Sequence, residues 1–126
     1  MINLQNQGIF RKPFVPKDDG VNFAVAGSTA LNSSFFTVRG IHVPQRNSPH
    51  SLQLNWFRNH LKYFAKHKDC EKRLQRALVF VGEIGVNDCN YAFFQGKQVE
   101  EISTNVPHVI RSITDGVQEV IRMVAI

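Results

Sequence analysis

The spacing of hydrophobic and polar positions predicts strands in two parts of the chain. Residues 77–81 (ALVFV) form an unbroken apolar run that ends at Gly82. Such a run, rich in β-branched and aromatic residues, is typical of a strand buried on both faces in a parallel sheet. Earlier in the chain, Val21, Phe23 and Val25 alternate with smaller residues, which predicts a second, shorter strand that ends at Gly27.

Helical periodicity appears between and after these strands. A helix is expected over residues 52–68, with Ser51 as its N-cap, because apolar residues recur there at helical spacing: Leu54, Phe57, Leu61 and Phe64. A long amphipathic helix is expected from about Pro107 to the C-terminus, after a short helical turn within 98–105. Residues 31–51 are interpreted as a long surface connection, and residues 1–20 as irregular. The order strand, helix, strand, helix predicts an α/β fold with parallel strands.

The charge of the chain raises the question of an anionic partner. The 126 residues carry a formal net charge of +5, with a pI of about 9.6. The cationic excess concentrates in one stretch: Arg58, Lys62, Lys66, Lys68, Lys72, Arg73 and Arg76. A nucleic-acid patch and the solvated face of a helix both fit this pattern. The second interpretation is favoured and no nucleic-acid partner is expected, because no nucleic-acid motif accompanies the charge.

Several other classes of protein and site are not expected from this sequence. No apolar run approaches the roughly 20 residues that span a bilayer, and residues 1–14 contain no apolar signal-peptide core. Cys70 and Cys89 flank the predicted strand, so they are expected at its opposite ends and not bonded to each other. A nucleophilic role for Cys89 is conceivable, but a buried structural thiol is favoured. Histidines, cysteines and carboxylates show no metal-ligand spacing, so neither a metal nor a cofactor is expected.

The ends of the two predicted strands carry groups suited to binding an oxyanion. Gly27 presents a backbone N–H without a side chain in the way. Asn87 presents two side-chain N–H donors. Such donors stabilise a developing negative charge on oxygen. A turn or helix cap is the alternative interpretation of Asn87 and Asp88, and Asp88 is interpreted as support for the loop.

Four stretches carry a resemblance to a known family. The chain resembles the plant GDSL esterase/lipases of the SGNH hydrolase superfamily in four blocks: GVNFAVAGSTAL (20–31), LQLNWF (52–57), ALVFVGEIGVNDCNYAFFQGK (77–97) and VPHVIRSI (106–113). The resemblance implies a flavodoxin-like parallel sheet with flanking helices and strand order 2-1-3-4-5. Residues 1–126 would be a single partial domain of this fold, truncated at both ends. The first strand would be missing between the two present, so the isolated chain is expected to be unstable or poorly cooperative.

The resemblance also implies an activity and a division of roles. The family's conserved Gly and Asn map onto Gly27 and Asn87, which would form part of the oxyanion hole. The nucleophilic Ser of a Gly-Asp-Ser block and the base His of an Asp-x-x-His block have no match here. The full-length protein is expected to hydrolyse a small-molecule acyl ester through an acyl-serine intermediate, and this chain alone is expected to be inactive. The alternative is an inactive module that binds a lipid, a glycan or a protein. The family implies secretion, with which the sequon Asn32-Ser33-Ser34 is compatible.

Overall fold

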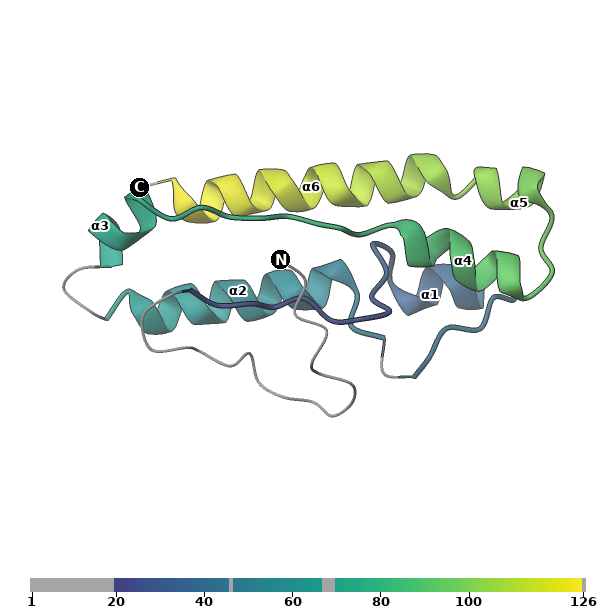
Figure 1. The fold of residues 1–126 in the computed structure, drawn as a ribbon, viewed down its shortest axis with the longest axis horizontal. Coiled ribbons are helices and arrows are strands. Elements are labelled where there is room, and N and C mark those ends of the chain that lie inside the picture. Colours follow the sequence, from purple (N-terminus) through teal and green to yellow (C-terminus); the bar gives the residue numbers. More distant parts are fainter. Residues whose placement is uncertain (1–19, 46, 67–69, 126) are drawn as a thin grey trace.

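The computed structural model describes residues 20–45, 47–66 and 70–125, without the side chains of Phe64 and Cys70. The expectation of irregular structure before residue 20 therefore lies outside the described residues. The helices run in the order α1 (Ser33–Thr37), α2 (His50–Phe64), α3 (Cys70–Gln75), α4 (Val86–Phe94), α5 (Val99–Ser103) and α6 (Val106–Val124) (Figure 1).

The prediction of an α/β fold with a parallel sheet is wrong for this structure, because its described residues contain helices and no strand. Residues 77–81 are extended but not buried, and Leu78 and Phe80 are 77% and 83% exposed. A cis peptide bond joins Gly82 to Glu83 just beyond them. Residues 21–25 are also extended, and Phe23 packs against α2 through edge-to-face contacts with Phe57 and His60.

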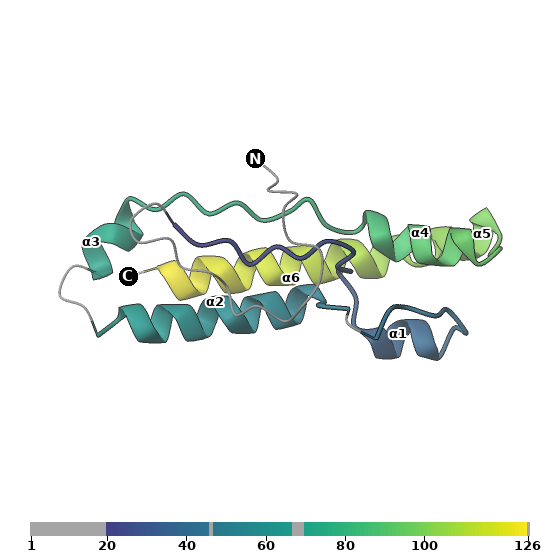
Figure 2. The same cartoon turned by 60° about the horizontal axis from the view of Figure 1, so that its bottom comes forward.

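The physical reason for this error lies in how strands are stabilised. A helix satisfies its backbone groups within its own segment, whereas a strand needs a neighbour to complete its hydrogen bonds. The extended segments 20–26 and 77–84 follow separate paths along the molecule (Figure 2), and no backbone hydrogen bond joins them. The apolar pattern of 77–81 therefore predicts the extended backbone but cannot supply the partner that burial requires.

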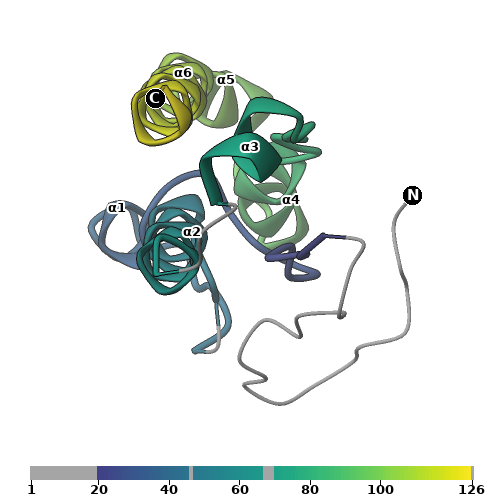
Figure 3. The same ribbon diagram turned by 90° about the vertical axis from the view of Figure 1, so that its left-hand side faces the viewer.

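The two long helices form the frame of the molecule. α2 and α6 run side by side in the same direction along its long axis (Figures 1 and 2). Viewed end-on, α2, α4 and α6 occupy separate corners of the molecule (Figure 3). α6 turns Val109, Gly116 and Val120 to the interior, and an ion pair joins Glu119 to Arg58 of α2. Both helices agree with the periodicity of the sequence.

The apolar core lies at one end of this frame. Phe36 of α1 is fully buried and packs with four residues from other parts of the chain: Ile41, Val43, Ala92 and Ile102. The interpretation of 31–51 as a surface connection is therefore wrong in part, because the connection contains α1 and three core residues: Phe36, Ile41 and Val43. The Ser51 cap is also wrong, since α2 begins at His50 with Pro49 as its N-cap.

Candidate functional site

Gly27 lies in a tight turn that only glycine fits well. Its φ of +80° is in the left-handed region, which L side chains rarely adopt. The hydroxyl of Tyr91 donates a hydrogen bond of 2.8 Å to the Gly27 carbonyl oxygen. A Cβ at this position would lie 3.0 Å from the same hydroxyl oxygen. Backbone conformation and crowding thus both favour glycine at the end of the extended segment.

Asn87 in the first turn of α4 contacts the residue next to Gly27. Its Nδ2 donates a hydrogen bond of 2.9 Å to the Ser28 carbonyl oxygen. This bond uses one of the two amide hydrogens of Asn87. The Gly27 N–H makes no hydrogen bond with the described residues. The structure thus brings the two predicted site residues to one loop, while their role in oxyanion binding stays a prediction.

Asp88 holds the other half of this loop. Its carboxylate is fully buried and accepts hydrogen bonds from the backbone N–H groups of Ala30 at 2.8 Å and Leu31 at 2.9 Å. Burial raises the pKa of Asp88, and these N–H donors act in the opposite direction. Because both carboxylate oxygens of Asp88 accept backbone hydrogen bonds, this residue supports the loop, as the sequence predicted.

Four further side chains and one backbone group hold residues 27–31, which we call the glycine loop. Tyr91 is one of them, and it follows Asn87 by four residues, one helical turn along α4. The others come from outside α4. Ser112 of α6 donates to the Ala30 carbonyl at 2.7 Å, Gln53 of α2 donates to the Ser28 hydroxyl at 2.9 Å, Asn47 donates to the Thr29 hydroxyl at 2.7 Å, and the backbone N–H of His50 donates to the Thr29 carbonyl at 2.9 Å.

Sequence reasoning missed these supports. The helical spacing of Asn87 and Tyr91 was a usable signal, because residues four apart share a helix face. No spacing could reveal the contacts of Ser112, Gln53, Asn47 and His50 with the loop, since they join distant segments.

The remaining candidates for chemistry do not join the glycine loop as reactive groups. Cys89 is a half-buried free thiol, and burial, followed by the negative charge of Asp88, raises its pKa. A raised pKa disfavours the thiolate that a nucleophile needs. The side chain of Cys70 lies outside the described residues. Within the described part, no three histidines, cysteines or carboxylates gather to hold a metal ion.

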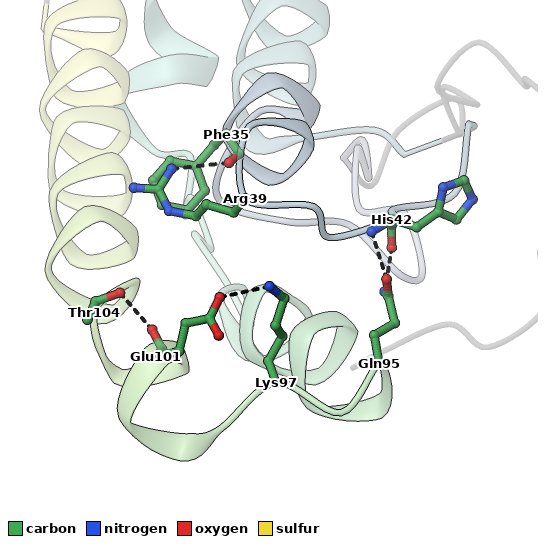
Figure 4. A network of polar contacts seen from close by, with 7 residues as sticks. All are labelled: Phe35, Arg39, His42, Gln95, Lys97, Glu101 and Thr104. Carbon is green, nitrogen blue, oxygen red and sulfur yellow. Dashed lines mark hydrogen bonds and ion pairs between the residues drawn. The ribbon is translucent and has the colours of Figure 1, made fainter.

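A half-open pocket of about 210 Å³ lies at the other end of α4. Its lining includes neither Gly27 nor Asn87. Three of its polar residues are already engaged within the chain (Figure 4): Lys97 donates to Glu101 at 2.9 Å, and Arg39 stacks on the ring of Phe35. The pocket is therefore separate from the predicted oxyanion donors. Across the described residues, no helix is long and apolar enough to cross a membrane.

The sequence is similar to curated plant esterases. A GDSL esterase/lipase of Arabidopsis thaliana is 54% identical over 106 residues, which cover 84% of this chain and 32% of the relative. A second Arabidopsis GDSL esterase/lipase is 46% identical over 84% of the chain and 28% of its own length. Acetylajmalan esterase of Rauvolfia serpentina is 45% identical over 82% of the chain and 27% of its own length.

The other comparisons found nothing similar. No protein-family model matches the chain, and no solved structure gives a significant match. The similarity is thus carried by sequence, and the matched part corresponds to about a third or less of each of these relatives. By this similarity the chain is a homologue of the plant GDSL esterase/lipases and matches a minor part of their length.

Proposed function

We propose that this chain is the part of an ester hydrolase that supplies two oxyanion donors, the Gly27 N–H and the Asn87 side-chain amide. The observation that carries the proposal is the hydrogen bond that the Asn87 side-chain amide donates to the carbonyl of Ser28, the residue that follows Gly27. Similarity to plant esterases over more than four-fifths of the chain supports the reaction class.

The proposed chemistry assigns a separate role to groups outside these 126 residues. A serine of the full-length protein would attack the ester carbonyl, expel the alcohol and form an acyl-serine, which water then hydrolyses. Each step passes through a tetrahedral oxyanion. Donors that point at this oxygen before the reaction begins stabilise it without reorganising, and one such donor is worth about 10² to 10³ in rate.

The test uses the full-length protein, obtained from the transcript sequence on either side of this reading frame. Asn87→Ala should lower kcat for a p-nitrophenyl ester about 100-fold or more and leave KM nearly unchanged, because the donor acts on the transition state. Asn90→Ala on the same helix is the matched control and should retain kcat. Undiminished kcat in the Asn87 variant would overturn the assignment.

A loosened glycine loop must be distinguished from a lost donor. Tyr91→Phe removes a hydrogen bond to the Gly27 carbonyl but no proposed oxyanion donor. If Asn87→Ala acts by removing a donor, Tyr91→Phe should have a much smaller effect on kcat. Equal losses in the two variants would mean that Asn87 acts through loop structure alone.

A non-catalytic module is the second candidate, because the chain has no match to the nucleophile and base blocks of the family. We expect the isolated chain to show no turnover of p-nitrophenyl esters and no labelling by a fluorophosphonate probe, since none of Ser28, Ser33 and Ser34 belongs to a Gly-Asp-Ser block. Robust labelling would contradict this expectation. Flanking sequence that lacks both missing blocks would favour the module.

We also propose that the protein enters the secretory pathway, as the family implies. Asn32 begins an Asn-Ser-Ser sequon and is exposed at the N-cap of α1. Expression in plant cells should give a glycoform whose gel mobility changes on treatment with a peptide N-glycosidase. The change should vanish in both Asn32→Gln and Ser34→Ala, and a protein that never carries a glycan would contradict the proposal.

A further inference from the structure

The half-open pocket of about 210 Å³ near the C-terminal end of α4 is a second place where the chain could bind a ligand. It lies between the segment that follows α1 and the helices α4 and α5. Figure 4 shows Arg39 on one side of this region, with Lys97 and Glu101 on the other. Neither of the proposed oxyanion donors lines it, so a ligand bound here would not depend on ester hydrolysis.

Asn105, the residue before α6, lines this pocket with a side-chain amide that has no partner. The residue is only 2% exposed. Its amide does not cap α6 and makes no hydrogen bond with any described residue. Buried polar side chains nearly always have a hydrogen-bond partner, because an unpartnered one has lost water without replacement. An unpartnered amide at the wall of a pocket therefore indicates a ligand that supplies the missing bond.

Arg39 brings a fixed positive charge to the same pocket. Its guanidinium carbon lies 3.6 Å from the centre of the Phe35 ring, and one of its nitrogens donates a hydrogen bond of 3.2 Å to the Phe35 carbonyl oxygen. In the described chain, no carboxylate pairs with Arg39. Stacking uses a face of the guanidinium and leaves N–H groups at its edges, which suit the two oxygens of a carboxylate.

The other residues of the pocket restrict the class of ligand. Lys97 and Glu101 pair at 2.9 Å and balance each other, so Arg39 leaves the lining with one net positive charge. A doubly charged phosphate would be repelled by the Glu101 carboxylate. The volume is below the roughly 300–1,000 Å³ of pockets for drug-sized molecules, so the ligand is small. Three apolar residues complete the lining: Ile41, Ala92 and Ile102.

We propose that this pocket binds a small monocarboxylate with a short apolar chain. The guanidinium of Arg39 and the NH₂ group of Asn105 donate hydrogen bonds to the carboxylate oxygens. The apolar chain lies against the isoleucines and Ala92. The ligand thus supplies both the charge that Arg39 lacks and the acceptor that Asn105 lacks.

The test measures butanoate binding to the full-length protein by NMR with labelled isoleucine methyl groups. The signals of Ile41 and Ile102 should shift with half-saturation on the order of 1 mM. Butan-1-ol and butylammonium lack the carboxylate, and inorganic phosphate lacks the chain, so each should bind at least about tenfold more weakly. Equal binding of any of these three would overturn the proposal. The absence of any shift with butanoate, as when another part of the full-length protein fills the pocket, would do the same.

Two variants separate ligand binding from a structural role. Arg39→Gln removes the charge, and Asn105→Leu removes the amide at similar volume. Each should weaken butanoate binding at least about tenfold. Because the Asn105 amide has no partner in the ligand-free protein, Asn105→Leu should not lower the urea concentration at the midpoint of denaturation.

Arg122→Gln is the matched control, because it removes the same charge from the exposed far end of α6. It should bind butanoate as the unaltered protein does. Undiminished binding in Arg39→Gln or Asn105→Leu, or a destabilised ligand-free Asn105→Leu protein, would contradict the assigned roles.

Discussion

At the residue scale, Asp88 is the strongest tie between α4 and the glycine loop. Asp88→Asn replaces one accepting oxygen by an NH₂ group, so one of the Ala30 and Leu31 N–H donors loses its acceptor. A buried donor without a partner costs about 1–3 kcal/mol. Hydrogen exchange should accelerate at Ala30 and Leu31 in this variant. Asp115→Asn on the exposed side of α6 is the control, and equal exchange in both variants would contradict the assigned role.

Gly116 leaves room for the buried ring of His50. A Cβ at position 116 would lie 2.3 Å from Cε1 of His50. Alanine normally favours a helix over glycine by about 1 kcal/mol, but overpacking here should outweigh this gain and give a net loss of about 1–3 kcal/mol in unfolding free energy. Urea denaturation measures the loss, and Thr114→Ala on the exposed surface of α6 is the control. Adding His50→Ala should relieve the clash, and a stabilised single Gly116→Ala variant would contradict the packing.

His50 also makes stability depend on pH. Its ring is buried with Nδ1 unpartnered, and burial lowers its pKa below 6.5. The folded state therefore favours neutral His50, so its contribution is complete above the ordinary pKa and is lost as the pH falls below 6.5. Half-buried His60 has a pKa shifted in the same direction by burial.

The urea concentration at the midpoint of denaturation should thus decrease as the pH is lowered from 7.5 to 5.5. Part of this fall should disappear in His50→Gln, while the same substitution at exposed His42 should leave it unchanged. An identical pH dependence in His50→Gln and the unaltered chain would contradict this cause.

At the element scale, the small core joins α1, α4 and α5. Phe36→Ala removes a ring that is completely buried among residues of these elements. A loss of about 3–5 kcal/mol is typical of such a truncation, which should unfold this end of the molecule at 25 °C. Phe94→Ala removes an equally large side chain that is 79% exposed and should have little effect. Circular dichroism of both variants measures the difference, and similar spectra would contradict the core assignment.

The periodicity of apolar residues predicted the two long helices, whose backbone hydrogen bonds lie within their own segments. The stripe of Leu54, Phe57 and Leu61 predicted α2, and the apolar positions after Pro107 predicted α6, because a helix makes its hydrogen bonds within one segment. The short turn expected within 98–105 corresponds to α5. α1 was missed because its five residues lie within a stretch rich in glycine and proline.

The strands were not predictable in the same way, because burial of an extended segment depends on neighbours that its own residues do not specify. Residues 77–81 have the composition of a buried strand and are nevertheless exposed. Gly27 and Asn87 were predicted from residue type and family blocks; the structure brings both to one loop, and their role in oxyanion binding stays a prediction. The supports from Ser112, Gln53 and Asn47 depend on tertiary contacts, which one sequence does not show.

At the scale of the whole molecule, the distance of the apolar core from long parts of α2 and α6 predicts that unfolding is weakly cooperative. The apolar core gathers around α1, α4 and α5, while long parts of α2 and α6 extend away from it (Figure 1). Many large apolar side chains stay exposed, including Leu78, Phe80 and Phe94. We therefore expect the isolated chain to unfold over a broad temperature range in calorimetry. A single sharp transition with equal calorimetric and van't Hoff enthalpies would contradict this expectation.

The bonds to the glycine loop have a consequence for the order of folding. Asp88 and Asn87 bind residues 57 to 59 positions earlier in the chain, and Ser112 binds a residue 82 positions earlier. Each bond closes a long loop of chain. The chain loses conformational entropy when the loop closes, before the hydrogen bond can stabilise the closed form. The loop should therefore acquire its shape late, after α2, α4 and α6 have formed. A spectroscopic probe at Ser28 would then report the last step of folding, whereas helical signals would report only the first.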